Sequence, residues 1–185
     1  YTYLEKYEDI FMKKMLSEMI WDAFESEQYM WKNKLVEREL VDKSVLHFLI
    51  DKSVKFEKAA LLLVLKEQIS EQAINVAQII GEIFWLTDDL CDFISDLKEQ
   101  RKNSLLYWNI PNKYLDLNER VVLATENMKN NVSQLEDCIN NLKKSANQKL
   151  YLYVIYMVKM WFGDIENIVT RSSRKLHEPN EYLLV

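Results

Sequence analysis

The chain is short of the residues that interrupt or cross-link regular structure. Its 185 residues include two glycines, two prolines, two cysteines and two histidines. So few turn-forming residues exclude a fold of many short strands and tight turns, and they predict long uninterrupted helices. Cys91 and Cys138 show neither a metal-ligand spacing nor a disulfide framework. We therefore expect a reducing, cytoplasmic environment.

Positive charge and long apolar runs are also lacking. The formal net charge is -5 at pH 7, and no contiguous basic stripe offsets it. Nucleic acid is therefore not expected as a partner. The longest apolar run, residues 59–65, is far too short to cross a bilayer. No membrane span is predicted.

Hydrophobic residues make up 49% of the chain and recur at helical intervals of three and four. We predict an all-α fold, an antiparallel bundle of long helices in one domain over residues 1–185. The expected helices cover residues 4–33, 41–67, 71–106, 116–144 and 145–162. Asp116–Glu119 and Ser145–Gln148 match the capping-box pattern that opens a helix. The apolar faces of the first two helices are expected to include Ile10, Phe11, Met15, Met19, Ile20 and Phe24, and Leu46, Leu49, Phe56, Ala60 and Leu63.

An acidic cluster in the third expected helix carries the strongest functional signal. Asp88, Asp92 and Asp96 recur at i, i+4 and i+8, so a helix places them on one face, and Asp89 adjoins them. Their neighbours are apolar enough to predict burial, and buried carboxylates are paired, protonated or bound to metal. No Lys or Arg lies within four residues of Asp88, Asp89 or Asp92. Mg2+ is the expected partner, with an exposed acidic helix face as the alternative.

The segment from Gly81 to Asn103 resembles the second metal-binding motif of class I isoprenoid synthases. In that superfamily, trans-prenyl diphosphate synthases carry Gly, Phe-Gln, Asp-Asp-x-x-Asp and a further Asp. Terpene cyclases carry a related triad at i, i+4 and i+8, followed by a basic residue and Asn. The matching residues are Gly81, Phe84, Asp88, Asp89, Asp92, Asp96, Lys98, Arg101, Lys102 and Asn103. Trp85 stands where the prenyl synthases have Gln.

Two further matches lie outside this segment. Lys52-Ser53 is similar to the Lys-Thr motif of the prenyl synthases, with Ser in place of Thr. Lys52 shares a helix face with apolar residues, where it reaches either a diphosphate or, by snorkelling, the solvent at the rim of the core. Arg171 and Arg174 loosely resemble the basic end of the last helix of terpene cyclases.

The resemblance implies a Mg2+-dependent enzyme that acts on an allylic prenyl diphosphate. Asp88, Asp89, Asp92 and Asp96 would bind more than one Mg2+ ion, and Asp88 and Asp92 would be catalytic through that metal. The residues implied to bind the diphosphate are Lys52, Arg101 and Lys102. Those implied to line the pocket for the hydrocarbon chain are Gly81, Phe84 and Trp85; for Gly81 and Trp85, ordinary packing at a close helix crossing is an equal alternative. Trp85 in place of Gln favours cyclisation or elimination over chain elongation.

One element of the family is missing. These enzymes carry a first Asp-rich motif on a facing helix far upstream of the second, and this chain has no room for it. Residues 22–27 are acidic but lack the pattern. Either the chain is the C-terminal portion of a larger isoprenoid synthase fold, or one metal-binding wall has been lost. A homodimer or a partner subunit would supply the missing helices. The alternative function is a non-catalytic accessory subunit or a degenerate binding protein.

Overall fold

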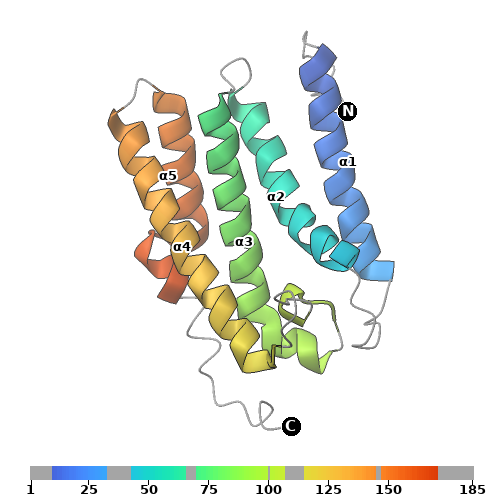
Figure 1. Ribbon diagram of the computed structural model, residues 1–185. Coiled ribbons are helices and arrows are strands. Elements are labelled where there is room, and N and C mark those ends of the chain that lie inside the picture. The colour runs from blue at the N-terminus through green and yellow to red at the C-terminus, as the bar shows by residue number, and fades with distance from the viewer. Residues whose placement is uncertain are drawn as a thin grey trace.

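The fold is an antiparallel bundle of helices, as predicted. The computed structural model describes residues 10–32, 43–65, 70–99, 101–106, 115–144 and 147–170, and none of these lies in a strand. Its elements are α1 (Ile10–Lys32), α2 (Lys43–Leu65), α3 (Glu71–Lys98), the short 3-10 helix η2 (Ser104–Leu106), α4 (Leu117–Lys144) and α5 (Gln148–Phe162). Consecutive long helices run in opposite directions (Figure 1). No helix in these ranges is long and apolar enough to span a membrane.

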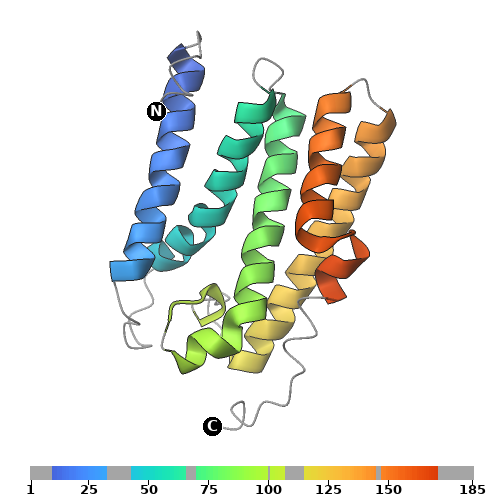
Figure 2. The ribbon, with the colours of Figure 1, turned by 180° about the vertical axis from the view of Figure 1, so that it is seen from behind.

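The central helix is α3, which packs between α2 and α4 (Figures 1 and 2). Helix α1 packs on α2 at one edge of the bundle, and α5 packs on α4 at the other while also touching α2. The inward faces of α2, α3, α4 and α5 form the main core, in which the largest fully buried side chains include Leu61, Ile83, Leu86, Leu90, Phe93, Met128 and Leu135. Both faces of α3 are therefore covered, which fixes the helix that carries the acidic cluster.

The helix starts follow local capping rules. Asp116 Oδ1 accepts a hydrogen bond from Glu119 N at 2.8 Å, and Glu119 Oε2 accepts one from Asp116 N at 3.1 Å. The predicted capping box at the start of α4 is thus confirmed. The second one is corrected, because the cap of α5 is Asn147, whose Oδ1 accepts from Leu150 N. Ser145 lies outside the described residues.

The end of α3 differs from the prediction. The helix was expected to continue to residue 106, but it ends at Lys98. The chain then turns back along α3 and forms η2. Arg120, buried at the start of α4, donates hydrogen bonds to the carbonyl oxygens of Leu105 and Leu106 and so holds η2 in place. Long-range contacts of this kind outweigh helix propensity.

Several residues expected to face the core are exposed. Ile20 and Phe24 of α1 are 41% and 49% exposed, and Phe56 of α2 is 61% exposed. Among the described helices, α1 packs mainly on α2, and the stripe that contains Leu16 and Ala23 is buried there. An apolar face predicts where a helix can pack, but not whether a neighbour covers it.

Gly81 sets the distance between α2 and α3. A Cβ atom at this position would lie 2.6 Å from Val54 Cα, a backbone atom that cannot move aside. Gly81→Ala should therefore lower the free energy of unfolding by about 1–3 kcal/mol, although alanine is the better helix former. Gln72→Ala, on the exposed side of α3, is the control. Denaturant unfolding of both variants checks this, and equal stabilities would contradict it.

Candidate functional site

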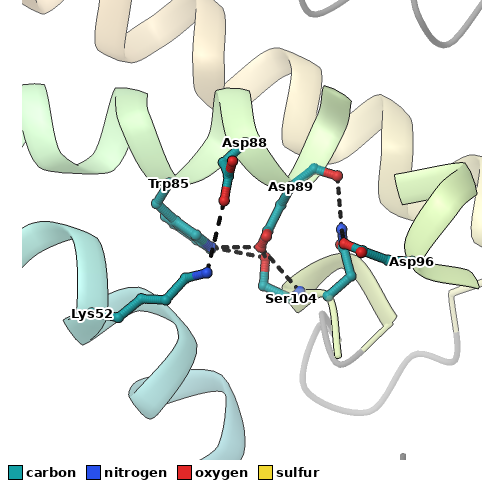
Figure 3. A network of polar contacts seen from close by, with 7 residues as sticks. Lys52, Trp85, Asp88, Asp89, Asp96 and Ser104 are labelled. Carbon is teal, nitrogen blue, oxygen red and sulfur yellow. Dashed lines mark hydrogen bonds and ion pairs between the residues drawn. The ribbon is translucent and has the colours of Figure 1, made fainter. Parts of the chain in front are cut away.

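The exposed end of the candidate site is an ion pair between α2 and α3. Lys52 Nζ lies 3.7 Å from Asp88 Oδ2 (Figure 3). The side chain of Asp88 is 60% exposed and that of Lys52 is 22% exposed. The two residues, which come from different helices, therefore lie side by side. The positive charge that the sequence lacks near Asp88 thus comes from another helix.

Asp89 occupies a different environment from its neighbour. It is buried, and its Oδ2 accepts hydrogen bonds from Trp85 Nε1 at 2.9 Å, from Ser104 N at 3.0 Å and from Ser104 Oγ (Figure 3). Trp85 Nε1 is also 2.8 Å from Ser104 Oγ. Burial raises the pKa of Asp89 to about 6, although the Ser104 hydrogen bonds and the charge of Lys52 oppose the rise. Protein donors therefore already engage this carboxylate.

Asp96 is linked to the same turn through Asn103. Asn103 Nδ2 donates to Asp96 Oδ2 at 3.1 Å and to the main-chain oxygen of Asp89 at 2.8 Å. Burial raises the pKa of Asp96; the Asn103 hydrogen bond opposes this, and the negative charge of Asp92 adds to it. The carboxylates at positions 92 and 96 are thus close enough to repel each other, which an added cation would relieve.

Two of the three residues expected to line a pocket for the hydrocarbon chain, Gly81 and Trp85, take other positions. Gly81 does not leave open space, since the backbone of Val54 occupies it. Trp85 is only 6% exposed and hydrogen-bonds within the core. Both assignments are corrected in favour of close packing. Phe84 is half-buried and stacks with Phe162 and, edge-on, with Trp161, at centroid distances of 5.3 and 5.0 Å.

The two basic residues that follow α3 lie in different environments. Arg101 is exposed and pairs with Glu99, with 2.6 Å between Arg101 Nη2 and Glu99 Oε2. Its charge also opposes the rise in the pKa of Asp96, so it lies within electrostatic reach of the acidic face. Lys102 is buried, and burial lowers the pKa of its amine. Arg171 and Arg174 lie outside the described residues.

The acidic face fits Mg2+ only as a partial site. Within the described ranges, no three Asp, Glu, His or Cys side chains converge closely enough to form a complete metal site. Mg2+ in phosphate-transfer sites is, however, usually held by one or two carboxylates, waters and phosphate oxygens. Asp88 and Asp92, one turn apart on α3, supply carboxylates of that number and type. The donor set therefore fits Mg2+ that shares its coordination with a bound phosphate group.

An apolar groove begins one helical turn from the ion pair. Phe56 follows Lys52 by four residues and so lies on the same face of α2. From there the groove, of about 700 Å³, runs between α2 and α5. Its walls are Phe56, Glu57, Ala60, Val64, Lys149, Leu152, Tyr153, Tyr156, Met157, Met160 and Trp161. Glu57 and Tyr153 give no local sequence signal of their contact, because they lie 96 residues apart in the chain.

Comparisons with known proteins do not assign the chain to a family. The chain matches no protein-family model, and no curated protein or solved structure shows significant similarity to it.

Proposed function

We propose that α2 and α3 form one wall of a Mg2+-dependent class I isoprenoid synthase site for an allylic prenyl diphosphate. The observation that carries this proposal is the Lys52–Asp88 ion pair, because Lys52 precedes the groove residue Phe56 by one turn of α2. A prenyl diphosphate has the same polarity, with a highly charged head and a long hydrocarbon tail. The resemblance of residues 81–103 to the family motif gives the proposal its reaction class.

Each part of the site has a chemical task in this proposal. The allylic carbon–oxygen bond breaks, and its electron pair leaves with the diphosphate. Lys52 donates a charge-assisted hydrogen bond to that leaving group. Asp88 and Asp92 would hold Mg2+, which when bound neutralises negative charge on the phosphate oxygens. The groove between α2 and α5 would hold the hydrocarbon chain against its apolar side chains.

The second acidic wall would come from another part of a larger fold, from a homodimer partner or from another subunit. Asp88 is exposed, so a facing acidic helix can approach it. Cyclisation or elimination remains favoured over chain elongation because Trp85 replaces the prenyl-synthase Gln and basic residues follow Asp96.

A second function has its own support. Asp89 is satisfied by Trp85 and Ser104, and Asp88 is paired with Lys52. These carboxylates are thus accommodated in the fold with the protein's own partners. This arrangement favours the alternative of an accessory subunit or degenerate binding protein that retains the helices without turnover.

Thermal melting separates the two functions. Mg2+ with farnesyl diphosphate should raise the Tm of the parent protein, because a ligand that binds only the folded state stabilises it by about 2.7 kcal/mol at 100 times its Kd. Asp88→Ala should abolish this rise. Asp137→Ala, which removes an exposed carboxylate from α4, should retain it. Identical melting of the parent and Asp88→Ala under every condition would favour the accessory function.

A further inference from the structure

Glu57 is an anomaly in the wall of the groove. It lies on α2, is only 6% exposed, and lines a groove whose other buried and half-buried walls are mainly apolar. Its Oε2 accepts a hydrogen bond from Tyr153 Oη at 3.3 Å. Within the described residues, no cationic side chain pairs with this carboxylate. Lys149, the basic residue of the groove, has an exposed side chain.

A carboxylate in such a place costs stability. Removing it from water is unfavourable unless a cation or several hydrogen bonds compensate, and Tyr153 supplies one. Burial raises the pKa of Glu57 to about 7, although the Tyr153 hydrogen bond opposes the rise. A large share of the molecules therefore carries a buried negative charge at neutral pH. The folded protein would be more stable with an apolar residue of similar size at this position.

The aromatic side chains around Glu57 also favour a positively charged ligand. Phe56, Tyr156 and Trp161 line the groove and are each at least half exposed. The faces of such rings attract cations, most strongly where water is excluded. Leu152, Met160 and Val64 add apolar surface that suits a hydrocarbon chain. The groove thus combines one buried anion, several ring faces and an apolar floor.

We infer that the groove between α2 and α5 binds an apolar molecule that carries a positive charge, with Glu57 as its counter-ion. Glu57 is the buried charge of the groove, whereas Lys149 is exposed to water. A buried carboxylate favours a cationic occupant over a neutral lipid, and one buried charge matches one cationic group better than it matches an amphipathic helix. The binding step itself needs neither Mg2+ nor Asp88. Such a cation either arrives charged, as an amphiphilic amine does, or is formed in place by loss of diphosphate, which rests on the proposed function.

Two probes of equal chain length test this inference. Octyltrimethylammonium and 1-octanol are titrated into the protein at pH 8.5, and binding is followed by calorimetry. The ammonium compound should bind about tenfold more tightly than the alcohol. Glu57→Gln keeps the shape and a hydrogen-bond acceptor for Tyr153, and should remove this preference while leaving octanol binding within twofold. Glu126→Gln, on the exposed side of α4, should leave both affinities unchanged.

The outcomes are separable. Equal binding of both probes by the parent protein would overturn the inference, even if Glu57→Gln failed to fold. Unchanged ammonium binding in a folded Glu57→Gln protein would also overturn it, as would binding of neither probe. Where ammonium binding is selective, tighter binding with Mg2+ and pyrophosphate indicates a cation formed in place, whereas no change indicates an amine that arrives charged. If Mg2+ and pyrophosphate do not tighten ammonium binding, the proposed function fails, whereas the inference about the groove still holds.

Discussion

Asp89→Ala should lower the free energy of unfolding by about 2–4 kcal/mol, whereas Asp88→Ala, one residue away, should lower it by less than about 1 kcal/mol. Asp89 is buried, and its carboxylate accepts hydrogen bonds from Trp85 Nε1 and from the main chain and hydroxyl of Ser104. Its removal leaves buried donors without their acceptor and opens a cavity. Asp88 is largely exposed, and its ion pair with Lys52 is screened by water.

Guanidinium unfolding of both variants measures this difference directly. Because the two residues have the same side chain and adjoin in one helix, each serves as the control for the other. Asp89→Asn extends the comparison, since its amide oxygen still accepts from Trp85 and Ser104, and it should lose far less stability than Asp89→Ala. Equal losses for Asp88→Ala and Asp89→Ala would show that the buried network does not stabilise the fold.

Asp88 and Asp89 illustrate which features of the site can be predicted from the sequence and which cannot. Spacing on a helix correctly places Asp88 and Asp92 on one face, and the lack of Gly and Pro correctly predicts long helices. The capping box at Asp116 is also local and therefore readable. Features that depend on residues within one or two turns follow from the sequence because the interacting groups are covalently close.

The rest depends on contacts between distant parts of the chain. Asp89 meets Ser104 only because α3 ends at Lys98 and the chain turns back, whereas helical periodicity predicts that it continues. The family resemblance assigns Trp85 to a substrate pocket, but its indole nitrogen hydrogen-bonds to Asp89 and Ser104. A pattern of apolar and acidic residues specifies which face of a helix is special, but not which partner reaches it.

The apolar faces show the same boundary. Phe56 belongs to a regular apolar stripe on α2 and was expected in the core, but the structure places it on the open wall of a groove. Periodicity is identical for a stripe covered by a neighbouring helix and for one left open to a ligand. Glu57 beside it gives no sequence signal either, because its partner Tyr153 is on α5.

The stability of the protein should fall as the pH rises from 5 to 8, by about 4 kcal/mol from two carboxyl groups alone. Burial raises the pKa of Asp89 from 3.8 to about 6 and that of Glu57 from 4.5 to about 7. The folded state therefore holds these protons more tightly than the unfolded state does. The stabilisation is complete below the unfolded values, near pH 4, and is lost as the pH rises through 6 and 7.

Unfolding of the parent and of an Asp89→Asn/Glu57→Gln double variant at each pH isolates this effect. The double variant carries neither titrating carboxyl, so its stability should be flatter by about 4 kcal/mol across this range, and it should exceed the parent most clearly at pH 8. Glu126→Gln removes one exposed charge and should keep the parental slope. A double variant with the full parental slope would show that both carboxyls titrate as they do in the unfolded chain. Glu57 lies in the groove and Asp89 in the core, so the two single variants show how much of the pH dependence comes from each carboxyl group. A ligand cation that pairs with Glu57 should reduce only the contribution of Glu57.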